Sequence, residues 1–206
     1  MLPFMTIFRL FVALLFVALA PIYPSAGAAE RLPGPGLRGD TLTRAAESML
    51  ADIGQATWIR DGQSQRVLYV FFDPNCPYCR KVYEGLRTQV EFGDVELRWI
   101  PIGILMTTSL GKAATMLESD DPTAALHRNE HRFSTDTGQF GGIEEEPAPR
   151  EETLQRLARN LALLRRSGQD AVPSLLYRGR DGKAYFVRGA PPPSALAKIL
   201  EELARS

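Results

Sequence analysis

The chain has 206 residues, with 24 basic and 24 acidic side chains, and therefore a formal net charge of zero. This balance does not favour nucleic acid or an anionic membrane surface as a partner. The length suits a single domain with an ordinary hydrophobic core, and two cysteines are too few for a scaffold held together by several disulfides.

The first 28 residues have the layout of a secretory signal peptide. Arg9 is their only cation, an apolar run follows from Leu10 to Ala20, and small residues end the segment. The apolar run is shorter than the roughly 20 residues that span a bilayer. We therefore expect cleavage after Ala28 or Ala29 rather than a retained anchor, and export to an oxidising compartment in which thiols and disulfides exchange.

The next part of the chain alternates between predicted helices and strands. Residues 29–56 are predicted to form a Gly/Pro-rich linker followed by a helix over 40–54. A strand, an Asp-Gly turn and a second strand follow. The second strand, Val67 to Phe72, is continuously apolar, as expected for a strand that is buried on both faces. Helical spacing begins at Cys76, and a further strand is predicted over 95–105.

Residues 57–206 are predicted to form one α/β domain with helices on both faces of a sheet. A segment of about 108–168 separates the strands and contains a short helix, a polar irregular stretch and an amphipathic helix over 151–166. Strands over 172–177 and 184–188 form a predicted hairpin, and a last helix follows. This order of elements resembles that of a thioredoxin fold with helices inserted in its middle.

Both cysteines belong to one CxxC motif, Cys76-Pro77-Tyr78-Cys79, at the predicted start of a helix. The unpaired N–H groups and the positive end of the helix dipole stabilise a thiolate at this position, so Cys76 is predicted to be an exposed nucleophile with a lowered pKa. Cys79, one turn further on, is predicted to be buried and to resolve the mixed disulfide. Pro77 suits the first turn because it lacks an N–H that would be left unpaired.

Other interpretations of the cysteines are less favourable. A structural disulfide that closes over two residues would constrain the unfolded chain very little, and a metal site needs more ligands than one CxxC provides. His127 and His131, in HRNEH, do not form the HExxH pattern and are interpreted as part of a solvated polar helix. We therefore expect a redox-active Cys76–Cys79 disulfide, with no metal and no other cofactor.

Four segments carry a resemblance to a known family. They are TWIRDG (57–62), YVFFDPNCPYCRKVY (69–83), RWIPIGIL with the Ala-rich helix after it (98–117), and AVPSLLYRGRDGKAYFVRGAPP (171–192). At these residues the chain resembles the periplasmic thiol–disulfide interchange proteins of the DsbG/DsbC type. The resemblance implies a thioredoxin-like fold, Cys76 as nucleophile, Cys79 as resolving thiol and Pro173 as a cis-proline beside them. The backbone at Val172 and Pro173 would then hold an extended client segment, although a proline that starts a strand can also be an edge device.

The resemblance also implies a function. Such enzymes reduce or isomerise wrong disulfides, and reduce oxidised single cysteines (sulfenic acids), on exported client proteins, and a membrane redox partner recharges their cysteine pair. The alternative in the same class is a monomeric oxidase of the DsbA type that donates disulfides. A client-binding chaperone with an incidental CxxC is the alternative from another class.

The chain differs from the family pattern at three places. Only residues 29–56 precede the catalytic domain, where family members carry a dimerisation domain, so a monomer is expected rather than a dimer. Val172 stands where the family has Thr, and it resembles the oxidase DsbA in this respect. Val70 stands where thioredoxin has a buried carboxylate. Proton transfer to and from Cys79 is therefore expected to use another group or water.

Overall fold

A computed structural model describes residues 39–136, 138 and 140–205 of the chain. The predicted signal peptide and its cleavage site after Ala28 or Ala29 lie outside these residues. Within the described ranges, none of the helices combines the length and the apolar character that crossing a membrane requires.

Five strands form one mixed sheet in the order β1-β3-β2-β4-β5. They are β1 (Ile59–Asp61), β2 (Val67–Phe72), β3 (Glu96–Pro101), β4 (Ser174–Arg178) and β5 (Ala184–Arg188). β2 and β3 are parallel, whereas the β1–β3, β2–β4 and β4–β5 pairs are antiparallel. The Asp-Gly turn after β1 does not make a hairpin, because β3 lies between β1 and β2. The predicted hairpin of β4 and β5 is confirmed.

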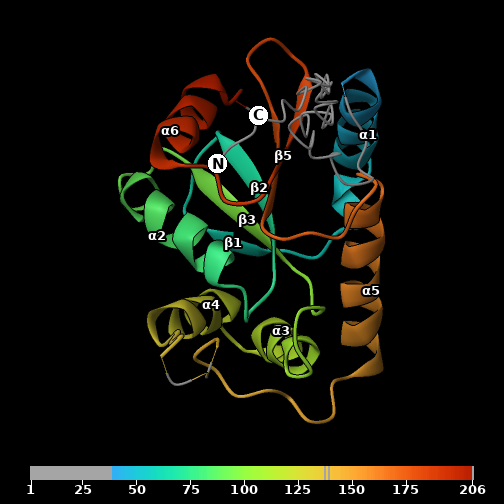
Figure 1. The fold of residues 1–206 in the computed structure, drawn as a ribbon, viewed down its shortest axis with the longest axis vertical. Helices are drawn as coiled ribbons and strands as arrows, with labels where there is room; N and C mark the ends of the chain where they lie inside the picture. The colour runs from blue at the N-terminus through green and yellow to red at the C-terminus, as the bar shows by residue number, and fades with distance from the viewer. Residues whose placement is uncertain (1–38, 137, 139, 206) are drawn as a thin grey trace, which may run out of the picture. The chain divides into compact units, whose positions relative to one another are not determined.

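Helices cover both faces of the sheet. They are α1 (Asp40–Ala51), α2 (Pro77–Glu91), α3 (Ser109–Glu118), α4 (Pro122–His131), α5 (Glu151–Arg165) and α6 (Pro193–Glu202), with a short 3-10 helix (Ile53–Gln55) after α1. α2 and α6 lie on one face of the sheet, and α1 and α5 lie on the other (Figure 1). α3 and α4 lie together beyond one end of the sheet (Figure 1). The predicted fold class, a central mixed sheet flanked by helices, is confirmed.

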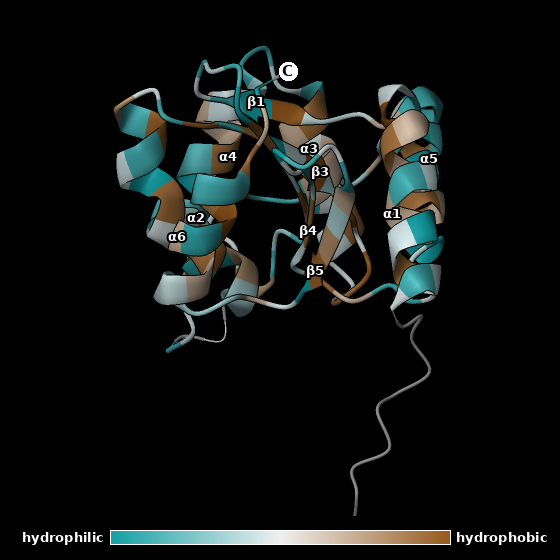
Figure 2. Ribbon diagram, turned by 90° about the horizontal axis from the view of Figure 1, so that it is seen from above, coloured by the Kyte–Doolittle hydropathy of each residue, from teal (hydrophilic) through white to brown (hydrophobic). Residues whose placement is uncertain are grey.

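β2 is the centre of the hydrophobic core. Leu68, Val70 and Phe72 contribute to the cluster that includes α2 and α6, while Tyr69 and Phe71 contribute to the cluster that includes α1 and α5. Successive side chains of a strand point to opposite faces of the sheet, which produces this division. Each large apolar side chain that is fully buried stabilises the fold by about 1.5–3 kcal/mol. Figure 2 shows the hydrophobic strands between the two helical layers. The continuous apolar run therefore reports burial on both faces, as predicted.

The chain between β3 and β4 holds α3, α4 and α5, which fall in the segment predicted as an insertion (108–168). α4 occupies part of the stretch that was predicted to be irregular. Its start has a local cause, because the Asp121 side chain accepts a hydrogen bond from Ala124 N at 2.9 Å and Pro122 stands at the first turn. The Asp-Pro pair is thus a helix start rather than a turn.

One polar residue of α5 fastens this helix to the sheet. Asn160 is buried, donates to the carbonyls of Thr57 and Pro101 (2.9 and 3.0 Å) and accepts a hydrogen bond from Thr57 N (2.9 Å). All three bonds go to backbone groups, those of Thr57, two residues before β1, and of Pro101, the last residue of β3. Asn160 therefore sets the height of α5 against the sheet and, with it, the start of the loop that follows β3.

Candidate functional site

Cys76 is the N-cap residue of α2, immediately after β2 and the Asp73-Pro74-Asn75 loop. Its sulfur accepts a hydrogen bond from Cys79 N at 3.3 Å, and its backbone N–H donates to the Asp73 carbonyl at 3.0 Å. An N-cap side chain that accepts from the first turn satisfies one of the free N–H groups of the helix. The sequence-predicted position of the thiol at the positive end of a helix is therefore present in the structure.

The pKa of Cys76 is lowered from its ordinary value. The largest cause is the hydrogen bond from the Cys79 side chain, and the backbone N–H groups of Cys79 and Tyr78 add to it. Burial and the nearby charge of Asp73 act in the opposite direction. Cys76 was predicted to be exposed, and this is wrong, because only 2% of its surface is accessible. The loop before α2 and the segment at Val172 cover the sulfur from two sides.

Cys79 has the opposite electrostatic character. Burial raises its pKa well above the ordinary value, and the hydrogen bond and charge of Cys76 raise it further. The pair is therefore asymmetric, with a thiolate favoured at Cys76 and a thiol at Cys79. Such an asymmetry separates an attacking sulfur from a resolving sulfur.

The two residues between the cysteines have different environments. Pro77 is the first residue of α2, where its missing N–H leaves no donor unpaired. The Tyr78 side chain is 58% exposed, and Lys81 Nζ lies 5.0 Å from the centre of its ring. Tyr78 is therefore a large, accessible side chain close to Cys76 in the sequence and on the same helix end.

Val172 and Pro173 lie against the cysteine pair, although 96 residues separate Val172 from Cys76 in the sequence. The Val172–Pro173 peptide bond is cis. The Cys76 sulfur lies 3.7 Å from the Val172 carbonyl oxygen. β4 begins only at Ser174, so Val172 precedes the ladder and its carbonyl faces the site. The structure thus brings together all six residues that the sequence singled out: Cys76, Pro77, Tyr78, Cys79, Val172 and Pro173.

Asp73 supports the loop that carries Cys76, and sequence reasoning did not identify it. Its side chain is fully buried and accepts four hydrogen bonds: one oxygen from Asn75 N (2.9 Å) and Ser109 Oγ (2.8 Å), the other from the N–H groups of Ile104 (2.8 Å) and Leu105 (3.0 Å). The strand predicted over 95–105 ends at Pro101. Ile102 N still donates to the Phe72 carbonyl of β2 at 2.7 Å, but the N–H groups of Ile104 and Leu105 bond to this carboxylate instead of a neighbouring strand.

Asn75 and Lys112 continue this polar network into the inserted segment. Asn75 donates to Thr108 and Ser109, both at 3.0 Å, and accepts a hydrogen bond from the buried Lys112 ammonium at 3.0 Å. Lys112 also donates to the carbonyl of Gly141 at 2.8 Å. The loop before Cys76 is therefore connected to α3 and to Gly141 by a continuous set of hydrogen bonds.

Gly141 packs directly against this loop, which leads to a prediction. It has a φ of +63°, and a Cβ there would lie 2.5 Å from the Pro74 carbonyl oxygen. We expect Gly141→Ala to lower the free energy of unfolding by about 2–4 kcal/mol, because left-handed strain and a backbone clash add together. Chemical denaturation measures the change.

Gly138 is the matched control for this prediction. It has a similar φ of +67°, but a Cβ there would meet no atom within 4 Å. Gly138→Ala should therefore cost only about 1 kcal/mol, the strain alone. Equal losses in the two variants would show that Gly141 does not support the loop by close packing.

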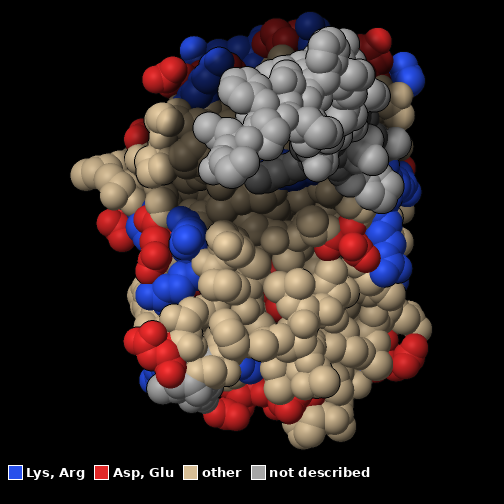
Figure 3. Space-filling view, viewed as in Figure 1, with Lys and Arg blue, Asp and Glu red and all other residues tan. Residues whose placement is uncertain are grey.

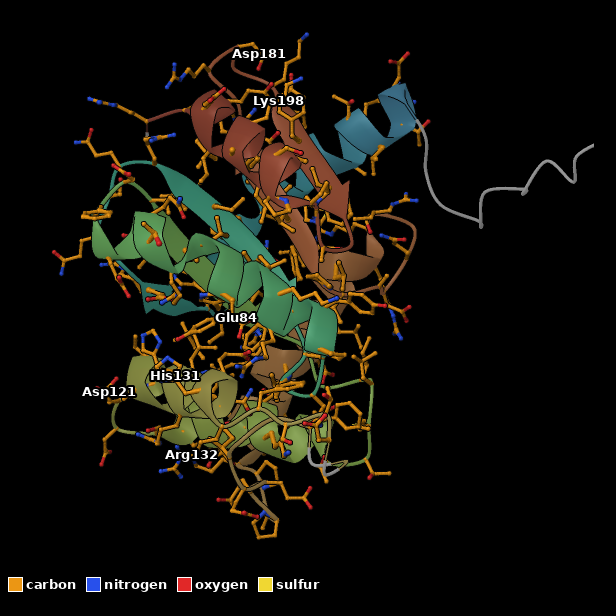
Figure 4. The ribbon with its side chains drawn as sticks, turned by 60° about the vertical axis from the view of Figure 1, so that its left-hand side comes forward. Glu84, Asp121, His131, Arg132, Asp181 and Lys198 are labelled. Carbon is orange, nitrogen blue, oxygen red and sulfur yellow. The ribbon has the colours of Figure 1, made fainter. Side chains whose placement is uncertain are left out.

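α4 differs from the solvated polar helix that HRNEH was taken to indicate. Asn129 and Glu130 are buried, while His127 and His131 both hydrogen-bond with the Tyr83 hydroxyl of α2, at 2.5 and 3.2 Å. Figure 4 shows α4, with His131 labelled, next to α2 with Glu84. The sequence interpretation is wrong because the face of α4 that carries Asn129 and Glu130 packs onto the site, which composition alone does not reveal.

A mixed five-stranded sheet, a CxxC motif that caps the helix after its central strand, and a cis-proline beside the sulfurs define the class of thioredoxin-like dithiol proteins. The sequence profile of the thioredoxin-like domain family matches residues 55–204. This chain belongs to that family.

Two characterised relatives bear out the resemblance drawn from the sequence. The thiol:disulfide interchange protein DsbG of Pseudomonas aeruginosa is 38% identical over 157 residues, which are 75% of this chain and 59% of the relative. DsbG of Escherichia coli is 26% identical over 176 residues, 83% of this chain and 68% of the relative. The chain thus spans about 59% of the length of the first relative.

Solved structures support the fold. The catalytic domain of Proteus mirabilis ScsC superposes with a TM-score of 0.57 at 21% identity, covering 76% of this chain and 96% of that domain. The thiol-disulfide exchange protein α-DsbA2 of Wolbachia pipientis has a TM-score of 0.58 at 15% identity, with coverages of 80% and 98%. At these identities the likeness concerns the fold alone.

Proposed function

We propose that this chain is a periplasmic thiol–disulfide oxidoreductase that acts on exported proteins, through the redox-active Cys76–Cys79 pair. The observation that carries the proposal is the place of Cys76: its sulfur accepts a hydrogen bond from Cys79 N at the start of α2 and lies 3.7 Å from the Val172 carbonyl oxygen, beside the cis Val172–Pro173 bond. The directions of the two cysteine pKa shifts, lowered at Cys76 and raised at Cys79, agree with it. The DsbG relatives, which are named thiol:disulfide interchange proteins, support it. A periplasmic thioredoxin-like protein of Salmonella enterica, similar in fold at a TM-score of 0.55, is consistent with the location.

The reaction consists of two exchanges at the same sulfur. The Cys76 thiolate attacks one sulfur of a client disulfide, an S–S bond forms between them, and the other client sulfur leaves as a thiolate. Cys79 then loses its proton and attacks Cys76, which releases the client and forms the Cys76–Cys79 disulfide. Two electrons pass to the client. If the released client thiolate attacks another disulfide instead, the result is isomerisation.

A sulfenic acid on a client is a second substrate that suits the same site. The Cys76 thiolate attacks the client sulfur and hydroxide leaves, which takes up a proton to become water. The mixed disulfide that forms is the same intermediate as above, and Cys79 resolves it in the same way. The proposal therefore covers disulfides and oxidised single cysteines with one mechanism.

The client segment is proposed to lie along Val172 and Pro173. Val172 precedes β4, so its backbone can pair with an extended chain as an added strand does, and its carbonyl already faces Cys76. The face seen in Figure 3 has a broad area without charged side chains, with charges mainly near its edges. Tyr78, at the start of α2, and Leu105 and Met106, in the loop after β3, have exposed apolar side chains. These features suit unfolded or partly folded clients with apolar segments.

The direction of the reaction separates two candidates. A reductase or isomerase is recharged by a membrane reductase and is kept reduced, whereas a DsbA-type oxidase is kept oxidised. Val172 before the proline favours the oxidase, while the DsbG relatives favour reduction. We propose the DsbG-like reductase or isomerase, acting as a monomer.

The redox state of the cysteines inside cells tests this choice. Cells are quenched with acid, free thiols are alkylated with a reagent of high mass, and the protein is resolved by gel shift. A mainly reduced pair supports the reductase and its membrane partner. A mainly oxidised pair would replace the reductase by the disulfide-donating oxidase.

The pH dependence of alkylation tests the thiolate at Cys76. The pKa of Cys76 is lowered, so the midpoint of its alkylation profile should lie below the ordinary thiol pKa of about 8.5. As the pH falls from alkaline values, the alkylation rate should therefore still be close to its maximum at about pH 8.5 and should decrease only at lower pH. Rapid mixing with iodoacetamide over a range of pH measures this profile. In the Cys79→Ala variant the midpoint should move upward, because the largest stabilising contact of the thiolate is removed. A midpoint at the ordinary value in the unsubstituted protein would contradict the proposed nucleophile.

A further inference from the structure

Resolution of the mixed disulfide requires Cys79 to lose a proton inside the protein. Cys79 is 1% exposed and its pKa is raised well above the ordinary value. Val70 occupies the position at which thioredoxin has a buried carboxylate, so no acid lies on β2 below the cysteine pair. The proton must therefore pass to water or to a group supplied by another part of the fold.

Glu130 of α4 is a buried acid on the same side of the molecule as the cysteines. Only 3% of its surface is accessible. Its Oε1 accepts a hydrogen bond from Asn129 Nδ2 at 3.0 Å, and the same amide nitrogen donates to the Pro74 carbonyl at 2.9 Å. Glu130 is thus connected through one amide group to the loop that carries Cys76. Its Oε2 is buried and makes no hydrogen bond with any of the described residues.

The charges around Glu130 come mainly from α2. Burial is the largest cause that raises the pKa of Glu130, to about 8. The Asn129 amide and the Arg80 guanidinium oppose this shift, whereas the negative charges of Cys76 and Glu84 add to it. Glu130 in turn raises the pKa of Cys79. The charges of the carboxyl group and of the two cysteines therefore act on one another, while the hydrogen bonds through Asn129 connect Glu130 to the loop that carries Cys76.

The other acids near the site are less suited to take the proton. Both oxygens of Asp73 already accept two hydrogen bonds each. Glu84 is half exposed and forms an ion pair with Arg80 at 2.8 Å. Glu130 alone among these three combines burial with an oxygen that has no hydrogen-bond partner in the described part of the chain.

We propose that Glu130 takes the proton from Cys79 when the mixed disulfide is resolved, and returns it when a client disulfide is formed in the reverse direction. This inference rests on the proposed function. In the forward step the Cys79 S–H bond breaks and its proton passes to the Glu130 carboxylate through one intervening water molecule, because no hydrogen bond joins Glu130 to a cysteine among the described residues. The electron pair left on sulfur forms the bond to Cys76. The client sulfur leaves with the electron pair of the mixed disulfide.

The charge of Cys76 determines at which stage of the reaction Glu130 can accept the proton. Before the reaction, the Cys76 thiolate helps to keep Glu130 protonated, because two negative charges in a buried site repel each other. Once Cys76 is part of a mixed disulfide, it carries no charge, and the ionised form of Glu130 becomes more favourable. Glu130 therefore becomes a better base at the stage at which Cys79 must be deprotonated. A base is effective in such a transfer when its pKa lies near neutral pH, and the pKa of Glu130 is raised to about 8.

The test follows the two exchanges separately in the reduced full-length protein. A peptide disulfide that carries a fluorophore and its quencher on opposite halves reports formation of the mixed disulfide, and release of the second half reports its resolution. Both rates are measured in rapid-mixing experiments over a range of pH. Glu130→Gln is compared with Glu84→Gln, which makes the same chemical change at an exposed acid near the same arginine.

We expect Glu130→Gln to slow resolution by about tenfold to hundredfold and to leave formation of the mixed disulfide within about twofold. Its resolution rate should rise steadily with pH, because hydroxide or water then replaces the carboxylate, and Glu130→Asp should recover part of the rate. Glu84→Gln should resemble the unsubstituted protein. These results together would support Glu130 as the proton acceptor.

Three outcomes would overturn the inference. Removing the Glu130 charge lowers the pKa of Cys79, so an acid that acted only through its charge would make resolution faster in Glu130→Gln. An unchanged rate and pH profile would show that the proton leaves by another route. Equal slowing of both steps, together with a lower melting temperature, would assign Glu130 a structural role only. If the unsubstituted protein formed no mixed disulfide, the proposed function itself would fail, which is a distinct result.

Discussion

Cys79→Ala is expected to convert the protein into a trap for its clients. Cys76 keeps its place at the N-terminus of α2 and still attacks disulfides, but no second thiol releases the mixed disulfide. Turnover in an insulin-reduction assay should fall by a factor on the order of 100 or more, because each molecule reacts once and stops. Non-reducing gels of periplasmic extracts should show client adducts of higher mass that disappear on reduction.

Cys76→Ala is the matched control for the trap. It removes the attacking sulfur and should give neither turnover nor adducts. It also addresses the chaperone alternative, because a chaperone with an incidental CxxC would suppress client aggregation equally well with alanine at position 76. Adducts that form through Cys79 in Cys76→Ala would reverse the assigned roles of the two sulfurs.

The fold and the place of the two cysteines at a helix start were predictable because they depend on strong local signals. The apolar run Val67 to Phe72 predicted a strand buried on both faces, which the structure confirms. The cysteine spacing placed Cys76 and Cys79 on one turn of helix. The approach of Val172 to Cys76 was accessible only through the resemblance to a family, since nothing local indicates a contact between segments so far apart in the sequence.

The supporting residues could not be predicted, because their partners come from distant parts of the chain. In the sequence, Asp73 is only the polar residue that ends a strand. In the structure, its carboxylate accepts hydrogen bonds from Ser109, Ile104 and Leu105. Glu130 lies in a stretch that is polar in composition, and only the packing of α4 shows that its side chain is buried. Periodicity predicts which face of a helix is buried from several residues together, so it cannot predict whether a single polar side chain faces the core.

The exposure of Cys76 illustrates the same limit. Its place at a helix start was predicted correctly, but whether neighbouring segments cover a sulfur depends on tertiary packing rather than on the motif. In the structure its surface is 2% accessible. Under the proposed function, a client would therefore have to approach along Val172, or the surrounding loops would have to move, before its disulfide reached Cys76.

Asp73→Ala is expected to have the largest effect on stability. The substitution leaves four donors without their acceptor: the buried Asn75 N and Ser109 Oγ, and the partly buried Ile104 N and Leu105 N. Buried donors without partners are costly, so we expect a loss of about 3–5 kcal/mol in the free energy of unfolding, measured by chemical denaturation. Asp94→Ala, at an exposed aspartate, should change it by no more than about 0.5 kcal/mol.

Asp73→Asn separates the role of the charge from the role of the hydrogen bonds. The amide keeps the volume of the side chain, but its NH₂ group must face one of the two pairs of donors, so a loss of stability of about 2–3 kcal/mol remains. The negative charge of Asp73 raises the pKa of Cys76. Removing this charge should therefore lower the midpoint of the Cys76 alkylation profile.

The lost charge and the weakened hydrogen bonds of Asp73→Asn shift the pKa of Cys76 in opposite directions, so the measurement distinguishes them. Loosening of the loop would separate Cys76 from the N–H groups of α2 and would return its pKa toward the ordinary value. A lower midpoint in a less stable protein can therefore come only from the lost charge. A more stable thiolate favours the reduced form, so the variant should also be a stronger oxidant in equilibrium with glutathione. A higher midpoint would mean that the hydrogen bonds of Asp73, rather than its charge, control the reactivity of Cys76.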